Sequence, residues 1–328
     1  MLDKYFPLYA LVFFLTLCIT ALTEKKIIPL LSRGARQPIY REGPAWHVSK
    51  SGTPTMGGLA FLLSILISLS LSCVFLIYSG NYEVGISLAI ATVYSIFNSA
   101  VGVIDDITKL RRKENAGLSP IQKLALQFLF AIIFLFARAA LLGDDTVISF
   151  SFGTVNLGIF YYPICVILLL GIVNSANLTD GIDGLATSVA FSIGVVLFYV
   201  SASLFYDVAF IASALIGASV GFLLFNIHPA KVFMGDTGSL FFGALTVSAV
   251  FSLKNPLLVI LIGGVYVIEG ASVVLQVLCY KATKKRIFKM APLHHHLEKC
   301  GMSENKICII AILTTFVTSI PAFIFYLP

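Results

Sequence analysis

The residues best suited to chemistry in this chain are two adjacent carboxylates, Asp105 and Asp106, at the end of a long apolar run. A basic segment follows at once, from Lys109 to Lys113. A carboxylate at the centre of a membrane helix costs about 2.5–3.5 kcal/mol, and less at the interface. If these two acids stood alone, they would be more simply explained as solvated loop residues. Three more acidic or histidine clusters recur at similar places, however, and together they indicate a site.

These further clusters lie in the segments 174–185, 226–240 and 290–298. Their candidate residues are Asn174, Asn177, Asp180, Asp183, Asn226, Phe233, Asp236, His294, His295 and His296. Glycines at 181 and 184 let backbone approach a ligand closely, and Phe233 is an exposed aromatic that could stack on a base. Consecutive histidines on a helix point about 100° apart, so one of the three is better explained as a phosphate or base contact than all three as metal ligands.

Several lysines and polar residues complete the set of candidates. Lys50 and Thr55 lie in a Gly, Thr and Pro turn that opens a helix, where backbone N–H groups can hold phosphate. Lys109 follows the acid pair, and Lys123 lies one turn after Ser119-Pro120, which is a helix start. Gln276 lies inside an apolar segment. The simpler alternative for the turn is a helix cap. The simpler alternative for Lys123 is a side chain that extends to the membrane surface.

The chemistry of these groups favours a metal-assisted reaction of phosphates. Oxygen ligands without thiolates suit Mg²⁺, and Mn²⁺ as well. Lysines, histidines and helix N-termini suit phosphate groups. Acids and bases around a hard cation fit transfer of a phosphorylated group.

The elements that must position these residues are membrane-spanning helices. Of the 328 residues, 58% are hydrophobic and 12% are charged, and the mean hydropathy is +0.96; a soluble domain carries about 25% charged residues. Runs of about 20 apolar residues predict an all-α integral membrane protein with about ten transmembrane helices. The predicted spans are 5–22, 57–78, 83–104, 120–141, 159–176, 185–203, 207–226, 237–253, 256–280 and 307–327. They predict a single transmembrane domain over residues 1–328.

The charge distribution predicts the orientation of the chain. The net charge is +6, and all but three of the 22 lysine and arginine residues fall in four loops, 23–56, 105–123, 227–236 and 281–306. Cytoplasmic loops collect Lys and Arg, so every candidate cluster is expected on the cytoplasmic face and both termini outside. The positive net charge is therefore explained by topology, and no nucleic-acid partner is expected.

Two further features are structural. Residues 144–158 are too polar to span and alternate in a way that predicts a small extracytoplasmic β-hairpin between spans four and five. The six cysteines are scattered without a CxxC pair, so neither a disulfide framework nor a thiolate metal site is expected.

Five strings carry a resemblance to a known superfamily. KSGTPTMGG (50–58), GVIDD (102–106), NLTDGIDGL (177–185), FMGDTGSL (233–240) and MAPLHHHLE (290–298) resemble motifs of the polyprenyl-phosphate N-acetylhexosamine-1-phosphate transferases. Within that superfamily the first and last strings are similar to the phospho-N-acetylmuramoyl-pentapeptide transferase family. The motifs occur in order from Lys50 to Glu298, and only Thr237 departs from the family's common valine.

The resemblance implies that undecaprenyl phosphate attacks UDP-N-acetylmuramoyl-pentapeptide in a bacterial cytoplasmic membrane, forming lipid I and releasing UMP, with Mg²⁺ required. By the same analogy the catalytic residues are Asp105, Asp106, Asp236 and His294, and the metal ligands are Asp236, Asp105 and Asp106. Asn174, Asn177, Asp180, Asp183, Asn226, Phe233 and Gln276 would line the uridine and diphosphate pocket. Lys50, Thr55, Lys109, Lys123 and His294 to His296 would contact phosphates, sugar or peptide. Membrane lipid is an expected partner, and a homodimer is implied.

Two alternatives stay open at this point. A sibling enzyme would use UDP-N-acetylglucosamine as the donor, although MAPLHHHLE argues against it. A cation- or proton-coupled transporter would also carry acids in its spans. Transporter sites lie near the membrane midplane, whereas these acids are all expected at the cytoplasmic face.

Overall fold

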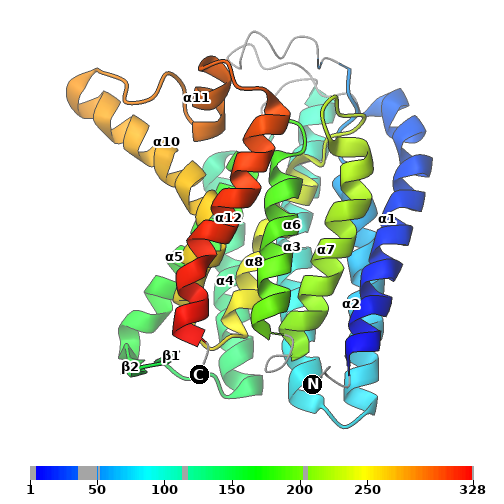
Figure 1. The fold of residues 1–328 in the computed structure, drawn as a ribbon, viewed down its shortest axis with the longest axis vertical. Helices are drawn as coiled ribbons and strands as arrows, with labels where there is room; N and C mark the ends of the chain where they lie inside the picture. The colour runs from blue at the N-terminus through cyan, green and yellow to red at the C-terminus, as the bar shows by residue number, and fades with distance from the viewer. Residues whose placement is uncertain (1–4, 36–49, 51, 113–116, 202–205, 327–328) are drawn as a thin grey trace.

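The computed structural model describes residues 5–35, 50, 52–112, 117–201 and 206–326. These residues form a bundle of helices with one two-stranded sheet at one end (Figure 1). The helices are α1 (Phe6–Gly34), α2 (Gly58–Tyr78), α3 (Tyr82–Arg112), α4 (Pro120–Leu142), α5 (Tyr161–Thr179), α6 (Leu185–Ser201), α7 (Tyr206–Asn226), α8 (Gly235–Phe251), α9 (Val259–Ile262), α10 (Gly264–Thr283), α11 (Leu293–Lys299) and α12 (Glu304–Tyr326). Two 3₁₀ turns, Gly158–Phe160 and Pro256–Leu258, precede α5 and α9.

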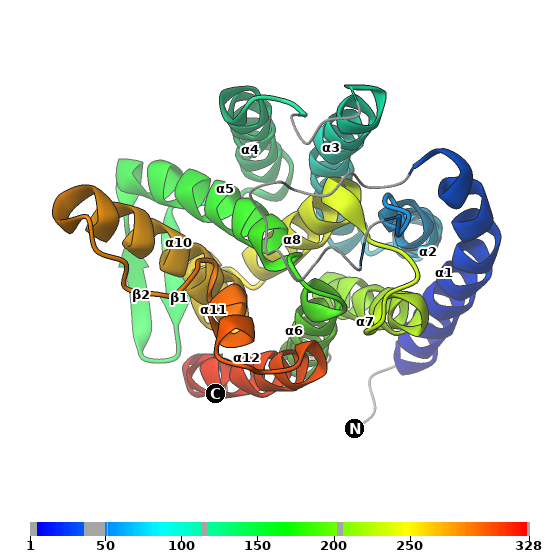
Figure 2. The same cartoon turned by 90° about the horizontal axis from the view of Figure 1, so that it is seen from above.

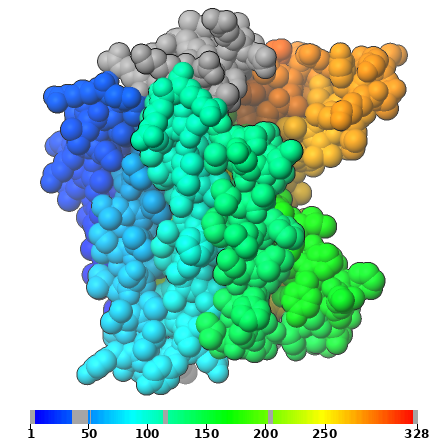
Figure 3. Space-filling view, turned by 180° about the vertical axis from the view of Figure 1, so that it is seen from behind, coloured from blue at the N-terminus to red at the C-terminus, as the bar shows by residue number. Residues whose placement is uncertain are grey.

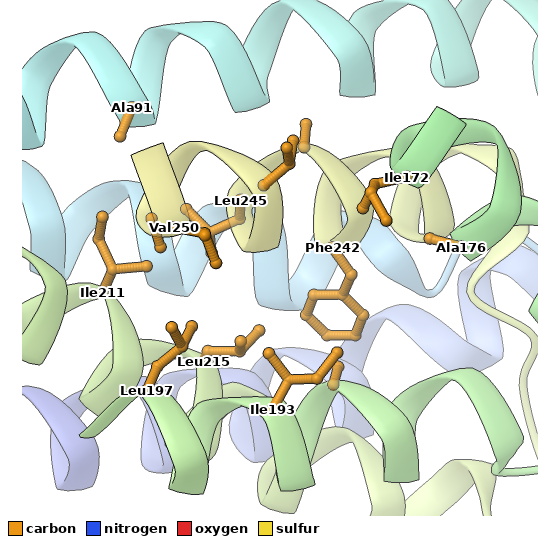
Figure 4. Packing of buried hydrophobic residues seen from close by; sticks show 14 of the residues in the cluster. Ala91, Ile172, Ala176, Ile193, Leu197, Ile211, Leu215, Phe242, Leu245 and Val250 are labelled. Carbon is orange, nitrogen blue, oxygen red and sulfur yellow. The ribbon is translucent and has the colours of Figure 1, made fainter. Parts of the chain in front are cut away.

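Helix α8 is the centre of the bundle (Figure 2). Every residue from Thr237 to Phe251 is buried, as expected of a helix that is apolar on all sides. Its side chains meet those of four neighbouring helices: Phe242, Leu245 and Val250 pack among residues of α3, α5, α6 and α7 (Figure 4). The N-terminus of this helix carries Asp236, so the packing of the core also fixes the site.

The chain is a multi-pass membrane protein. Eight of the described helices are long and apolar enough to cross a membrane. The predicted spans 185–203 and 237–253 also form helices, but α6 and α8 have only 17 residues each. The helical class is therefore confirmed, whereas the number of spans stays a prediction.

Three predicted span boundaries were wrong. Helix α1 continues from the predicted end at residue 22 to Gly34, and Pro29 lies within this extension. Helix α3 continues past Ile104 to Arg112, and Lys109 pairs with Asp105 one turn earlier, so both acids lie within the helix. The predicted span 256–280 breaks at Gly263, whose backbone is not helical. Beyond this break α10 projects out of the bundle (Figures 1 and 3).

One local prediction is confirmed, and the predicted hairpin is present as a two-stranded sheet whose side of the membrane stays a prediction. Ser119 caps α4 with a reciprocal capping box: its side chain accepts from the Gln122 N–H, and the Gln122 side chain accepts from the Ser119 N–H. The hairpin between α4 and α5 consists of β1 (Val147–Phe150) and β2 (Gly153–Asn156), which are antiparallel. Helix α1 begins and α12 ends at the end of the bundle that carries this hairpin, and α11 lies at the opposite end (Figure 1).

Arg138 ties four helices together near the hairpin end. Its guanidinium pairs with Asp144 at 2.6 Å and donates to the hydroxyl of Ser252 and the carbonyl of Phe251. Ser87, which also lies beside Arg138, donates to Asp207 at 2.6 Å. One of the three basic residues outside the predicted cytoplasmic loops is thus neutralised within the protein.

Candidate functional site

The site begins where α3 crosses the start of α8. At the crossing point α3 carries Gly102, and a Cβ added there would overlap the carbonyl of Asp236 and lie 2.6 Å from the Thr237 nitrogen. Only glycine allows this approach without a shift of the backbone. One turn later the helix presents Asp105 and Asp106 to the same place.

Asp105 and Asp236 share two lysines. Lys109 Nζ lies 2.7 Å from a carboxylate oxygen of Asp105 and 3.2 Å from one of Asp236. Lys123 Nζ, from the first turn of α4, lies 3.0 Å from Asp105 and 2.5 Å from Asp236. Three helices therefore converge on one charged cluster, and the predicted candidates Asp105, Asp236, Lys109 and Lys123 are brought together.

Asp106 has a different environment from its neighbour. One of its oxygens accepts from both the N–H and the hydroxyl of Thr237, at 2.9 and 2.7 Å, and the other accepts from the N–H of Asp236 at 3.1 Å. It thus satisfies N–H groups in the first turn of α8 that have no partner within the helix. Asp106 holds the start of α8 in place, and Asp105 faces the lysines.

The donor set of this cluster fits a divalent cation. Asp105, Asp106 and Asp236 each offer one oxygen within 4.8 Å of the others, and hard oxygen ligands are those that Mg²⁺ prefers. Three carboxylates and the ammonium groups of Lys109 and Lys123 leave one negative charge uncompensated, before Asp180 is counted. The residues that are present therefore suit Mg²⁺.

Asp180, which caps the C-terminus of α5, is a fourth acid of this cluster. Its carboxylate accepts no hydrogen bond from the described part of the chain. Burial raises the pKa of Asp180 to about 8, and repulsion by the carboxylates of Asp236 and Asp106 adds to the effect. The carboxyl group of Asp180 therefore keeps its proton to a higher pH than an exposed aspartate does.

The raised pKa of Asp180 predicts a pH dependence of stability. From about pH 4 to pH 8 the folded protein holds a proton that the unfolded chain releases, so raising the pH over this window lowers the free energy of unfolding. In Asp180→Asn this component is absent. We expect the unfolding midpoint of the wild type, measured with a chelator present, to fall more between about pH 5 and pH 8 than that of the variant. Asp145→Asn, at an exposed acid, is the control, and parallel pH curves for wild type and Asp180→Asn would contradict the assignment.

A second polar cluster surrounds Lys50. Its ammonium group lies 2.8 Å from Asp183 and 2.7 Å from Glu304, and His228 Nδ1 lies 2.9 Å from Asp183. Burial alone would raise the pKa of Asp183, but hydrogen bonds from Lys50, the N–H of Ala230 and His228 outweigh it and hold the pKa below its usual value. Lys50 offsets one of the two negative charges, and Asp183, His228 and Glu304 form a second group whose ligand atoms lie within 4.8 Å of one another.

A cavity of about 450 Å³ opens beside the Lys50 cluster. His228 and Glu304 form one side of it, and Met302, Ser303 and Asn305 contribute to the rest. Its volume falls within the range of about 300–1,000 Å³ that small-molecule sites occupy. Charged and polar side chains form part of the lining, which suits a water-soluble ligand.

The three consecutive histidines point to three different places, as predicted. His294 is fully buried, and its Nδ1 lies 3.2 Å from a carboxylate oxygen of Glu269. His295 pairs with Glu298 at 2.6 Å. His296 accepts the N–H of Lys289 on its Nδ1. Only His294 lies against the loop between α5 and α6, where a Cβ added to Gly181 would overlap its Nε2.

Some of the remaining candidates lie beside the acid cluster, and others bond to the backbone around it. Thr55 is buried beside Gly235, close to Asp106, and Asn177 donates to Ser239 in the first turns of α8. Phe233 is half-buried, not exposed as predicted, and its backbone is bonded to Pro54 and Gly57.

Three predicted ligand residues bind other parts of the chain. Asn174 donates to Gln127 and to the Leu170 carbonyl. Asn226 is 2% exposed and donates to the Val232 carbonyl, so it fixes the loop before α8. Gln276 is bonded to the backbone of Ile287 and Phe288 and does not reach the acid cluster. The sequence alone does not show whether a polar side chain in an apolar helix binds a ligand or bonds to the backbone of a nearby turn.

Sequence reasoning did not place Glu304, His228 or Glu269 in these clusters, although it singled out Glu269 as an acid within an apolar segment. Glu304 is the first residue of α12 and His228 precedes a proline, so each resembles an ordinary helix-end or turn residue. Glu269 gave a usable signal, since an acid within an apolar segment usually faces the interior of a helical bundle. Its partner lies 25 positions away and could not be deduced from spacing.

Comparison with known proteins gave two family matches and many similar relatives. Residues 87–254 match the model of glycosyl transferase family 4, and residues 50–62 match a phospho-N-acetylmuramoyl-pentapeptide-transferase signature. The chain is 41% identical over 292 residues to the phospho-N-acetylmuramoyl-pentapeptide-transferase of Clostridium botulinum (strain Alaska E43), covering 88% of this chain and 87% of the relative. It is 42% identical to the proteins of the same name from Halalkalibacterium halodurans (90% of each chain) and Caldicellulosiruptor bescii (84% and 83%).

Proposed function

Because this chain belongs to the phospho-N-acetylmuramoyl-pentapeptide-transferase family, we propose that it catalyses the step of peptidoglycan synthesis that forms lipid I. It transfers phospho-N-acetylmuramoyl-pentapeptide from the UDP donor to undecaprenyl phosphate, forming lipid I and releasing UMP. The observation that supports an active site for this reaction is a cluster of three acids and two lysines. Its members are Asp105, Asp106, Asp236, Lys109 and Lys123. Family membership removes the transporter alternative.

The reaction exchanges one phosphoanhydride partner of the sugar phosphate for another. An oxygen of undecaprenyl phosphate bonds to the phosphorus that carries the sugar, and the bond from that phosphorus to the bridging oxygen breaks as UMP leaves. Both reactants bring negative charge, so positioning and charge neutralisation dominate the rate of such a transfer. Lys109 and Lys123 supply two fixed positive charges at the acid cluster.

The acid cluster is the proposed cation site. Asp105, Asp236 and Asp106 would each offer one carboxylate oxygen to Mg²⁺. Bound there, the ion would neutralise charge on the diphosphate. Asp106 has the further task of holding α8, which keeps Asp236 beside the lysines.

The loop between α5 and α6 is proposed to bind the nucleotide part of the donor. Asp183 lies in this loop and is anchored by Lys50 and by the N–H of Ala230. The half-buried ring of Phe233 is close in sequence to Asp236 and remains the candidate for stacking on the base. Asn177 and Asp180 bridge this loop to the acid cluster.

Asp183→Asn is predicted to weaken donor binding more than chemistry. The change removes a charge that orders Lys50 and the loop, while the acid cluster at the start of α8 is untouched. We expect the KM for the UDP donor to rise about 10-fold, which corresponds to about 1.4 kcal/mol, with kcat little changed. Steady-state kinetics of UMP release measures both constants, and Asp145→Asn serves as the matched exposed control. An unchanged KM would exclude Asp183 from nucleotide binding.

The proposed setting is the bacterial cytoplasmic membrane, with the site on the cytoplasmic face. The α11 end of the bundle carries exposed cations, among them Lys281, Lys284, Lys285 and Arg286, and basic residues collect on the cytoplasmic side. A water-soluble UDP donor can reach the site from that side only. Family resemblance also suggests a homodimer, and the molar mass of the detergent-solubilised protein tests it.

Donor choice tests the proposed function against its nearest rival. Purified protein with undecaprenyl phosphate and Mg²⁺ is given either UDP-N-acetylmuramoyl-pentapeptide or UDP-N-acetylglucosamine. We expect UMP release with the muramoyl donor alone, and none after chelation of the metal. Release with only the glucosamine donor would keep the mechanism and change the substrate.

A further inference from the structure

The pairing of Glu269 with His294 is not explained by any role given so far. Glu269 is 5% exposed on α10, and His294 is fully buried in the first turns of α11. The two carboxylate oxygens accept the backbone N–H of His294 at 3.2 and 3.3 Å. One of them also lies 3.2 Å from the ring Nδ1. The acid therefore holds both the backbone and the ring of the histidine.

This contact determines which ring nitrogen of His294 carries the proton. An ionised carboxylate only accepts hydrogen bonds, so the Nδ1 that faces it must donate. In the neutral ring Nε2 is then left with a lone pair. A bond to one ring nitrogen commonly fixes the role of the other in this way.

The free nitrogen lies against the loop between α5 and α6. His294 Nε2 is buried and has no hydrogen-bond partner among the described residues. It lies against Gly181, where any added Cβ would overlap it, and Gly181 follows Asp180 in the loop between α5 and α6. Glycine at this position lets the imidazole reach the loop. An unpartnered polar atom there is costly, about 1–3 kcal/mol, unless a ligand uses it.

We propose that Glu269 is a positioning residue that fixes His294 with Nε2 as a hydrogen-bond acceptor for an N–H or O–H group of the donor substrate. The assignment rests on the transfer reaction proposed above. The substrate group is held at the loop 180–184, and the carboxylate acts on it only through the imidazole. The lone pair of the neutral Nε2 would accept a hydrogen bond from a hydroxyl or amide group.

Two variants separate this role from simple packing. Glu269→Met has no polar atom and releases the ring, so kcat should fall about 10- to 100-fold while the KM for the donor changes little. Glu269→Gln keeps an oxygen that can accept the Nδ1 proton and should recover most of the loss. Val274→Ala, an exposed change on the same helix, is the control and should leave both constants as they are.

A double variant asks whether Glu269 acts through His294. In the His294→Gln background, Glu269→Met should cause no further fall in kcat, because there is no imidazole left to position. If the double variant instead loses kcat by the product of the two single losses, and its unfolding midpoint is lower, Glu269 has only a structural role. That result would overturn the proposal.

The tautomer itself supplies a readout that does not depend on turnover. Nitrogen NMR of protein with isotope-labelled histidine, assigned by the signal lost in His294→Gln, reports which ring nitrogen is protonated. We expect Nδ1 protonated in the wild type and a mixed population in Glu269→Met. A protonated Nε2 in the neutral wild-type ring, or an unchanged tautomer in Glu269→Met, would refute the inference even if UMP release is normal. Absence of UMP release with the expected tautomer would instead refute the proposed function.

Discussion

Asp236→Asn is expected to reduce turnover about 1,000-fold while the protein still inserts and folds. Asparagine is isosteric, and the N–H of residue 236 can still bond to Asp106, so the start of α8 should keep its place. The variant loses the carboxylate that pairs with Lys109 and Lys123 and that would hold the cation. The initial rate of UMP release at saturating donor measures the loss.

The neighbouring acids provide an internal comparison for that result. Asp105→Asn should also abolish turnover with little effect on the unfolding midpoint, because Asp105 faces the lysines. Asp106→Asn should lower the midpoint as well, because its oxygens accept three hydrogen bonds from the start of α8. Turnover near the wild-type rate in Asp236→Asn would remove that residue from the mechanism, and equal midpoints for all three variants would contradict the separate roles of Asp105 and Asp106.

Gly102→Ala is expected to abolish activity without changing any polar group. The added methyl would overlap the backbone of Asp236, so α3 and α8 must move apart. Overpacking of this kind costs about 1–3 kcal/mol, and a displacement of about 1 Å between reacting groups costs about 100-fold in rate. Thermal unfolding and UMP release measure the two effects.

Gly171→Ala is the matched control for this substitution. Gly171 lies within α5 with nothing within 4 Å of an added Cβ. Alanine there should be neutral, or stabilising by about 0.5–1 kcal/mol through helix propensity, and should leave turnover unchanged. Equal effects of the two substitutions would show that the close crossing of α3 and α8 does not position the site.

Much of the site could be predicted because its residues follow or precede long apolar runs. Polar clusters in such positions are expected to gather at one face of a membrane protein, and the clusters carried by α3, α4, α5 and α8 do meet. This argument correctly placed Asp105, Asp236, Lys109 and Lys123 together. It could not place Glu304 beside Lys50, because that contact joins positions 254 residues apart.

The separate roles of Asp105 and Asp106 were also beyond the sequence. Adjacent residues of a helix point about 100° apart, so one of the two had to face elsewhere, but which one depends on how α3 packs against α8. The boundary of α3 was wrong for a related reason. Its last turns are polar, and the ion pair between Asp105 and Lys109 shows that the helix continues beyond the apolar residues.

The fate of one phosphorus atom tests the central claim most directly. The muramoyl-pentapeptide donor would carry radioactive phosphorus only at the position bonded to the sugar, and would be incubated with the protein, undecaprenyl phosphate and Mg²⁺. If this chain transfers phospho-sugar at the acid cluster, the label moves into the butanol-extractable lipid, unlabelled UMP is released, and Asp236→Asn shows neither. Label that stays in a water-soluble nucleotide while sugar reaches the lipid would show cleavage of the bond from sugar to phosphate, and would contradict the account.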